Sequence, residues 1–271
     1  MNYRHGYHAG NFADVVKHLA LVAILLHLRK KDTAFTVVDS HAGRGTYDLS
    51  GPQAGKTAEA QNGIARLADL SGNMPQALST YLSLVRQVGG GHYPGSPLII
   101  AKLLRPQDRL IAIEKHPEEF AVLQQILGPF RQAVAESGDG YVRTLKLLPP
   151  PSRRGLVLID PPFESPDEFS VLARTVREAA RKFATGIYLV WYPIKSQAEA
   201  DGFCGEVLAG GLAKAMTIET TISAAPGKLA HAGLLVVNPP YGFATAIHDL
   251  GGLIALSLQA HIQSAWLVGE E

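Results

Sequence analysis

The chain has 271 residues, of which 46% are hydrophobic and 18% are charged, so it can bury one sizeable α/β core and a small added subdomain. A formal net charge of +1 excludes a strongly basic nucleic-acid coat, and a single cysteine, Cys204, excludes an internal disulfide or a cysteine-built metal site. The longest apolar run near the start, residues 19–26, is too short to cross a bilayer. We therefore expect a cytoplasmic protein with no membrane partner, and a monomer, because no heptad pattern or long apolar stripe demands a second chain.

The first predicted element is a helix that begins after Asn11. Asn11 is suited to cap this helix, and Asp14 stands three residues later in the capping-box position. Apolar residues then recur at helical spacing as far as Leu26, and the cations at 29–31 favour a helix C-terminus. A short strand is predicted at 34–39, and a glycine-containing turn follows it.

Residues 48–91 differ in character from the sequence on either side. A Gly-Pro pair opens this stretch and three consecutive glycines close it, while apolar spacing between them predicts two helices, around 64–68 and 78–88. A strand and the helix that follows it do not need so long a connection. We therefore predict a helical insertion subdomain at 48–91 within a main domain formed by 1–47 and 92–271.

Strands alternate with helices after the insertion. Strands are predicted at 109–114, 133–136, 155–160 and 186–192, and helices at 117–127, 141–148 and 166–183. Two further strands, 215–222 and 233–238, are expected to pair as an antiparallel hairpin. The alternation predicts an α/β fold with a doubly wound, mostly parallel sheet, to which this C-terminal hairpin is added.

Acidic residues stand just past four of the predicted parallel strands, at Asp39, Glu114, Asp139 and Asp160. In open α/β sheets this edge is where ligands bind. Glu114 is suited to accept hydrogen bonds from two ribose hydroxyls, and the Asp139-Gly140 pair is suited to contact an adenine ring. Any one of these acids could be an ordinary exposed strand end, but their shared position indicates a nucleoside site.

The turn after the first strand, Asp39-x-His41-Ala42-Gly43-x-Gly45, resembles the methionine-cofactor loop of class I methyltransferases. Glycine lets the backbone approach a ligand closely, and we expect this of Gly43. His41 occupies the place of the first glycine. A dinucleotide site fits less well, because Asp48 occupies the position of its third glycine. An ordinary tight turn is the alternative.

The segment Asp160-Pro161-Pro162-Phe163 follows the clearest predicted strand and suits methylation of a planar exocyclic amine. The Asp160 carboxylate and the Pro161 carbonyl provide two acceptors for the two N–H groups of such an amine. The adjacent prolines stiffen the turn and fix the direction of its carbonyl groups. Phe163 offers a face on which a flat base can stack. These residues are the predicted catalytic group.

A second segment, Asn238-Pro239-Pro240-Tyr241, also resembles an amino-methyltransferase turn. It follows the last predicted strand, which is expected to be antiparallel. The end of that strand would therefore lie at the opposite edge from the cofactor. We predict a structural role for this segment.

The N-terminal residues 3–11 interleave aromatic rings, histidines and a cation, and Lys17 follows on the first helix. This composition suits stacking and phosphate contacts with unpaired RNA, and it makes Tyr3, His5 and Lys17 the predicted RNA-binding residues. The alternative is a disordered start followed by a solvated helix face. His5 and His8 have no acid or cysteine to complete a metal site, so no metal is expected.

The opening Tyr-Arg-His-x-x-His-Ala-Gly-Asn-x-Ala-Asp-Val-x-Lys-His, residues 3–18, resembles the RlmJ family, which methylates N6 of an adenine in bacterial 23S ribosomal RNA. The resemblance continues through residues 39–43, 93–97, 152–155, 160–162 and 191–193 and covers nearly the whole chain. It implies a Rossmann-like class I methyltransferase with S-adenosyl-L-methionine as the methyl donor. It also implies that Tyr3 meets the RNA and that Asp160 is the catalytic acceptor. The cofactor contacts implied are His18, His41, Ser96, Glu114, Asp139, Gly140 and Asp160.

Other activities remain open at this point. The Asp-Pro-Pro-Phe turn alone does not separate an RNA substrate from adenine N6 in DNA or from a protein glutamine. A non-catalytic RNA-binding module with a vestigial cofactor site is a further alternative, and His41 in place of glycine is its best support. An oxidoreductase is the least favoured, because the third glycine of the dinucleotide motif is missing.

Overall fold

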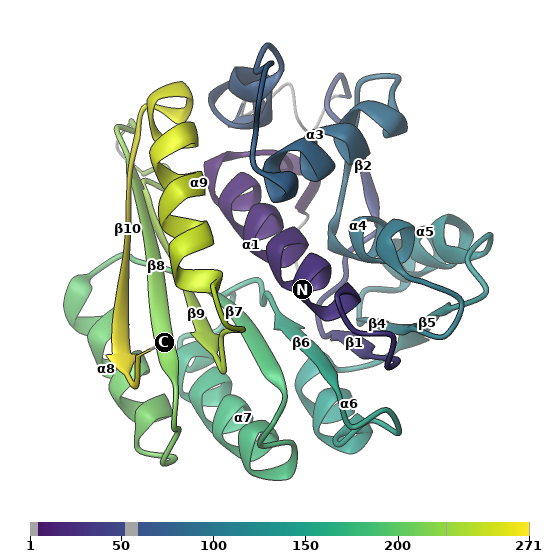
Figure 1. Cartoon of the computed structure of the whole chain (residues 1–271), viewed down its shortest axis with the longest axis vertical. Helices are drawn as coiled ribbons and strands as arrows, with labels where there is room; N and C mark the ends of the chain where they lie inside the picture. The colour runs from purple at the N-terminus through teal and green to yellow at the C-terminus, as the bar shows by residue number, and fades with distance from the viewer. Residues whose placement is uncertain (1–4, 52–58, 226, 271) are drawn as a thin grey trace.

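The computed structural model describes residues 5–51, 59–225 and 227–270, and the side chains of all of these except His5. Within them, the main sheet has eight strands in the order β10-β8-β9-β7-β6-β1-β4-β5 (Figure 1). The parallel strands are β1 (Thr36–Asp39), β4 (Arg109–Glu114), β5 (Ala133–Ser137), β6 (Gly155–Ile159) and β7 (Ile187–Pro193). The pairings of β8 (Ala215–Ile222), β9 (His231–Val237) and β10 (Ala260–Val268) are antiparallel.

Helices cover both faces of this sheet (Figure 1). One face packs against α1 (Phe12–Arg29), α3 (Gln76–Val88), α4 (Ser96–Leu103), α5 (Pro117–Leu127) and α9 (Phe243–Leu258). The other face packs against α6 (Gly140–Leu147), α7 (Glu168–Lys182) and α8 (Gln197–Leu208). Along β6, Leu156 and Leu158 belong to the first core, while Val157 and Ile159 belong to the second. A strand buried on both sides explains this continuous apolar run.

The predicted fold class is confirmed. The sheet is doubly wound, since the chain moves outward from β1 in one direction through β4 and β5 and in the other through β6 and β7. The predicted C-terminal hairpin is the β8–β9 pair. The sequence did not predict β10, whose residues are mostly small or polar and lie partly exposed at the edge of the sheet.

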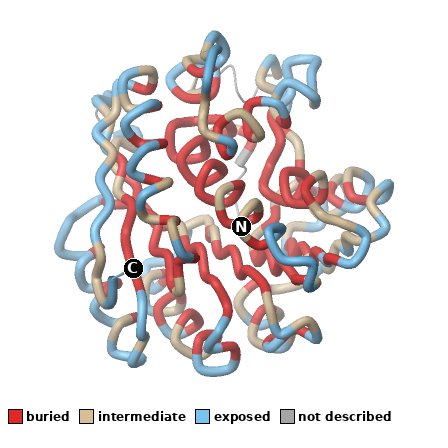
Figure 2. The backbone as a smooth tube through the Cα atoms, in the orientation of Figure 1, coloured by how far each residue is buried: buried red, intermediate tan, exposed pale blue. Residues whose placement is uncertain are grey.

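Helix α1 lies at the centre of its face of the sheet and is buried along most of its length (Figure 2). Asn11 caps it as predicted, because its Oδ1 accepts a hydrogen bond of 2.9 Å from the Asp14 N–H. The capping-box expectation for Asp14 was wrong. Its Oδ2 accepts instead from the Gly10 N–H, at 2.9 Å, and its Oδ1 accepts from Lys17. Asp14 therefore connects the loop before the helix to the next turn.

The segment predicted as an insertion is bounded by a two-stranded antiparallel ribbon of β2 (Thr46–Asp48) and β3 (His92–Pro94). Between these strands the structure describes α3 and two 3₁₀ helices, η2 (Glu59–Asn62) and η3 (Ile64–Leu67). The first of the two predicted helices is thus a short 3₁₀ turn. Buried residues of η3 and α3 join the same hydrophobic cluster as α1, so this segment completes the core on that face. Its separation as a subdomain stays a prediction.

The start of β6 provides a test of the packing between central strands. A Cβ atom at Gly155 would lie 1.9 Å from the carbonyl oxygen of Thr36 on β1. We expect Gly155→Ala to lower the free energy of unfolding by roughly 2 to 4 kcal/mol, because neighbouring strands cannot separate without losing their ladder. Urea denaturation measures this change.

The matched control is Gly202→Ala in α8, where an added Cβ would meet no atom within 4 Å apart from its chain neighbours and its own helix backbone. Alanine is the better helix former, so this variant should gain up to about 1 kcal/mol. Equal effects of the two substitutions would contradict the packing described for β1 and β6.

Candidate active site

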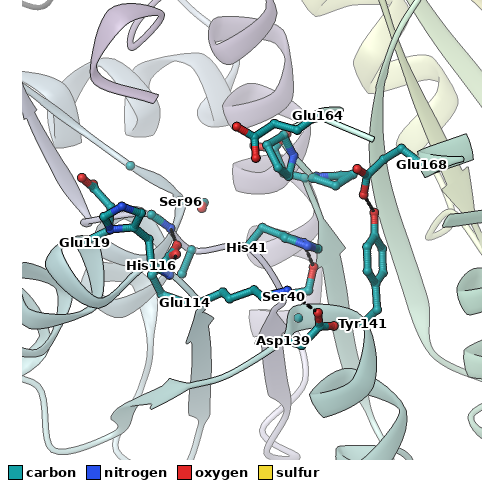
Figure 3. Close-up of a pocket in the computed structure, with 18 of the residues that line it drawn as sticks. Ser40, His41, Ser96, Glu114, His116, Glu119, Asp139, Tyr141, Glu164 and Glu168 are labelled. Carbon is teal, nitrogen blue, oxygen red and sulfur yellow. Dashed lines mark hydrogen bonds and ion pairs between the residues drawn. The ribbon is translucent and has the colours of Figure 1, made fainter. Parts of the chain in front are cut away.

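A cavity of about 390 Å³ opens at the carboxyl edge of the parallel strands, and this is a usual size for a small-molecule site (Figure 3). The turns after β1, β4, β5 and β6 all contribute to its wall. Ten of the predicted site residues line it: Lys17, His18, His41, Gly43, Ser96, Glu114, Asp139, Gly140, Asp160 and Pro161. The structure thus brings together residues that are far apart in the sequence. Tyr3 and the side chain of His5 lie outside the described residues.

A buried ion cluster connects α1 to the turn after β6. The Lys17 ammonium contacts Asp14 Oδ1 at 2.7 Å and also donates to Asp160 Oδ2. Burial alone would lower the pKa of Lys17, but the two carboxylates outweigh it and hold the pKa above its usual value. Lys17 is therefore a permanent cation. Within the described residues no hydrogen bond occupies Asp160 Oδ1, so this oxygen can accept from a substrate.

The position of Lys17 disagrees with its predicted contact to RNA phosphate. Only 3% of the residue is exposed, and its charge is already shared between two carboxylates. A buried ammonium that is already paired cannot also contact an RNA phosphate at the protein surface. The alternative of a solvated helix face does not hold either, because Lys17 and His18 are both buried.

Asp39 ends β1 beneath the cavity and is fully buried. Its Oδ2 accepts from Ser96 Oγ at 2.7 Å, and its Oδ1 has no partner among the described residues. Burial raises the pKa of Asp39 to about 7; the hydrogen bond from Ser96 opposes this shift, and the charge of Asp160 adds to it. Asp39 was recognised at a strand end but was not predicted as a site residue. Its strand-end position was the available signal.

The wall beside the first turn carries two aromatic rings. His41 Nδ1 shares a hydrogen bond of 2.7 Å with Ser40 Oγ, and the His41 ring meets Tyr141 edge-on, with 4.9 Å between ring centroids (Figure 3). Burial lowers the pKa of His41 to about 4, so the ring is neutral at physiological pH. The Tyr141 hydroxyl donates to Glu168 Oε1 at 2.5 Å. Sequence reasoning missed Tyr141 and Glu168, because their pairing depends on the packing of α6 against α7.

Glu114 is held by the backbone of two neighbouring turns. Its Oε2 accepts from the Gly43 N–H at 2.8 Å and its Oε1 from the His116 N–H at 2.6 Å. Burial raises the pKa of Glu114, and these hydrogen bonds oppose the shift. The carboxylate is therefore fixed in direction at the rim of the cavity.

Asp139 has a structural role in addition to its place in the cavity wall. Its Oδ1 accepts from the Val142 N–H at 3.2 Å and so caps α6, while its Oδ2 accepts from Lys115 at 3.0 Å. Burial alone would raise the pKa of Asp139, but the hydrogen bonds from Lys115 and the Val142 N–H, together with the charge of Lys115, outweigh it and lower the pKa. The cavity wall thus carries an ionised acid at this point.

Residue 140 must be glycine, because two turns lie in close contact at this point. A Cβ atom there would lie 2.0 Å from the carbonyl oxygen of Ser40. The turn after β5 therefore packs directly on the turn after β1, and the two form one continuous wall of the cavity.

His18 belongs to a buried hydrogen-bonded chain behind the cavity. Its Nδ1 bonds the Tyr93 hydroxyl at 2.7 Å, and that hydroxyl bonds the Tyr81 hydroxyl at 2.8 Å. The rings of His18 and Tyr93 are also stacked, with 5.6 Å between centroids. These hydrogen bonds connect α1 to β3 and α3. The segment between β2 and β3 therefore helps to position His18.

Phe163 is the predicted catalytic residue that does not line the cavity. Its ring makes edge contacts with Phe169 and Trp191, at centroid distances of 4.8 and 5.7 Å. Its φ of 51° lies in the left-handed region, which is unusual for a residue with a Cβ atom. Its stacking on a base stays a prediction.

The Asn238 segment lies at the opposite edge of the sheet, as predicted. Asn238 Nδ2 donates to the carbonyl oxygens of Ala184 and Gly186, at 2.9 and 2.7 Å. These bonds tie the end of β9 to the start of β7. The segment has a structural role here.

The described parts of the chain contain no cluster of three or more histidine, cysteine or acidic side chains able to hold a metal ion. In the same residues, no helix is both long enough and apolar enough to cross a membrane.

Comparison with known proteins gives a consistent result. Residues 32–268 match the model of a family described as ribosomal RNA large subunit methyltransferase D, RlmJ. The chain is 33% identical to ribosomal RNA large subunit methyltransferase J of Haemophilus influenzae, over 99% of this chain and 98% of the relative. It is 34% identical to the protein of the same name from Escherichia coli, over the full length of both. The crystal structure of protein LPL1258 from Legionella pneumophila superimposes with a TM-score of 0.88 at 32% identity, covering 95% of this chain and 98% of that one.

The buried Asp39 predicts a pH dependence of stability. Its pKa is about 7 in the folded chain against an ordinary value of 3.8, so the folded state binds the proton more strongly. The contribution of Asp39 to stability is then complete below about pH 4 and is lost as the pH rises towards 7. We expect Asp39→Asn to gain stability relative to the wild type across this window, by at most roughly 1.4 kcal/mol per pH unit.

Urea denaturation of both proteins at a series of pH values measures this difference. Other groups, His41 among them, titrate in both proteins and largely cancel when the two curves are subtracted. A difference that stays constant from pH 4 to 7 would contradict the burial of an unpaired Asp39 oxygen.

Proposed function

The chain belongs to the RlmJ family of ribosomal RNA large subunit methyltransferases, and from this premise we propose that it methylates N6 of an adenine in 23S ribosomal RNA, with S-adenosyl-L-methionine as donor. The observation that carries the proposal is the Asp160-Pro161 turn at the cavity, with one carboxylate oxygen held by Lys17 and the other open to a substrate. We further propose that it acts as a cytoplasmic monomer.

The chemistry of the cavity wall fits S-adenosyl-L-methionine. This cofactor carries a sulfonium and an ammonium group, and carboxylates of Glu114, Asp139 and Asp160 face the cavity. Two buried polar atoms close to it, Asp39 Oδ1 and His116 Nδ1, lack partners within the described residues. In our proposal the Glu114 carboxylate accepts hydrogen bonds from the ribose hydroxyls of the donor.

The other proposed cofactor contacts are distributed around this acidic wall. Asp139 and Gly140 approach the adenine ring of the cofactor, and His18, His41, Gly43 and Ser96 complete the enclosure. The neutral ring of His41 suits this place, since it adds no positive charge opposite a cationic ligand. The bound donor would supply an electrophilic methyl group.

Asp160 and Pro161 act on the amine of the target adenine. The lone pair of that nitrogen is delocalised into the ring, so the amine is a poor nucleophile. Asp160 Oδ1 and the Pro161 carbonyl accept its two N–H groups and draw the nitrogen towards tetrahedral geometry as it forms a bond to the methyl carbon. The bond from that carbon to the donor sulfur would break, and its electron pair would stay on a neutral thioether. After transfer the nitrogen is cationic, and Asp160 accepts the proton that it releases. Positioning and electrostatics thus supply the catalysis without a covalent enzyme intermediate.

The target base must leave its stack to reach this turn, at a cost of a few kcal/mol, so an unpaired adenine is the expected target. We propose that Phe163 supports one face of the base and that Tyr3 and His5 contact the RNA around it. The aromatic cluster of Phe163 with Phe169 and Trp191 supports the first of these roles, because it fixes the ring beside the catalytic turn.

Product analysis tests the function. Purified protein, donor labelled in its methyl group and unmodified 23S ribosomal RNA are incubated, and the RNA is digested to nucleosides. The proposal predicts labelled N6-methyladenosine. Transfer to DNA or protein alone would retain the chemistry and change the substrate, whereas donor binding without any transfer would favour a binding module.

The catalytic role of Asp160 makes a specific prediction. Asp160→Asn should lower kcat by at least about 100-fold, because the amide cannot accept both the N–H hydrogen bond and the proton as a carboxylate does. The affinity for the donor, measured by calorimetry, should fall much less than kcat.

Asp32→Asn is the control, since Asp32 is an exposed acid on the connection that leads into the opposite end of β1. Equal loss of turnover and donor affinity in Asp160→Asn would count against the assigned role.

A further inference from the structure

Glu59, the first residue of η2, faces the loop that leads into α1. Its Oε2 accepts from Asn11 Nδ2 at 3.1 Å and pairs with His8 Nδ1 at 3.0 Å. Only 17% of its side chain is exposed. Burial alone would raise the pKa of Glu59, but the bonds from His8 and Asn11 outweigh it and lower the pKa. Glu59 is therefore an ionised acid that joins two points of the N-terminal segment.

The backbones of the two segments also meet directly at this place. The Ile64 N–H donates to the Gly10 carbonyl at 2.8 Å, and a Cβ atom at Gly63 would lie 2.0 Å from that same oxygen. Gly10 itself has a φ of 75°, in the left-handed region that favours glycine. The loop before α1 is consequently fixed against the η2–η3 turn, and Glu59 determines how its polar side chains are directed.

Asn11 connects Glu59 to the first turn of α1. Its Nδ2 donates to Glu59, while its Oδ1 accepts from the Asp14 N–H at 2.9 Å. The amide cannot turn over without losing both bonds, because its two ends have opposite hydrogen-bonding character. Asp14 in turn holds the Lys17 ammonium, and Lys17 donates to Asp160. A continuous series of polar contacts therefore connects Glu59 to the catalytic carboxylate.

We propose that Glu59 is a positioning residue for methyl transfer. It does not line the cavity, and it acts through Asn11, Asp14 and Lys17 on the direction of Asp160. This inference rests on the proposed function, since it assigns Glu59 to the reaction carried out at Asp160. A residue of the segment between β2 and β3 would thus control turnover at a site that it does not touch.

Two substitutions break the link between Glu59 and Asn11 from opposite sides. Glu59→Met keeps the length of the side chain but removes both acceptor oxygens, so that His8 and Asn11 lose the atom that they share. Asn11→Ser keeps a good helix cap but removes the amide that reaches Glu59. Asp69→Asn is the matched control, since Asp69 is an exposed acid of the same segment.

The experiment measures kcat and KM for unmodified 23S ribosomal RNA, the calorimetric Kd of S-adenosyl-L-methionine and the Tm. We expect each of the two variants to lower kcat by at least about ten-fold, as a small misplacement of a catalytic group does. The Kd of the donor should stay unchanged, and Asp69→Asn should behave as the wild type. The double variant should be no slower than the slower single variant, because both substitutions remove one link.

Three outcomes would overturn the proposal. Wild-type kcat in Glu59→Met would show that the direction of Asp160 does not depend on Glu59. A joint fall of kcat, donor affinity and Tm would assign Glu59 to folding alone, and multiplying effects in the double variant would mean that the two residues act separately. In each of these cases the wild type still methylates RNA, so the proposed function stands. An inactive wild type would overturn both proposals together.

Discussion

The ion cluster of Asp14, Lys17 and Asp160 is the interaction on which the rest of the site depends. A cation buried between two carboxylates is costly to desolvate, and removing any one partner would leave an uncompensated charge. Such a cluster contributes little net stability but permits few alternative arrangements. It fixes α1 against the turn after β6, and that contact places the first turns of α1 beside the carboxyl edge of the sheet.

The charges around the cavity follow from this arrangement. Lys17, which is buried, balances part of the negative charge of Asp14 and Asp160. Burial keeps His41 neutral and favours the protonated form of Asp39. The acids at the rim stay available for hydroxyl and cationic groups of a ligand. The chain therefore supplies direction and electrostatic complementarity, and the chemistry at a flat amine needs no nucleophile from the protein.

Sequence patterns predicted an element correctly wherever nearby residues alone determine its structure. The strands 109–114 and 215–222 and the helix 117–127 were predicted with the bounds that the structure has, because strand propensity and turn residues mark them. The acids at strand ends were predicted from the rule for open sheets. The pairing of Lys17 with Asp160 spans 143 positions and depends on packing. The edge strand β10 carries no strong local signal, so it was missed as well.

A double-mutant cycle in the free energy of unfolding tests the central claim most directly. Lys17→Met, Asp160→Asn and the double variant are each denatured in urea at neutral pH, and the non-additive part gives the coupling between the two side chains. The buried pair predicts a coupling of at least about 1 kcal/mol, with the double variant less destabilised than the sum of the singles. Additive effects would show that α1 and the catalytic turn are not joined through these residues, and the account of the site would fail.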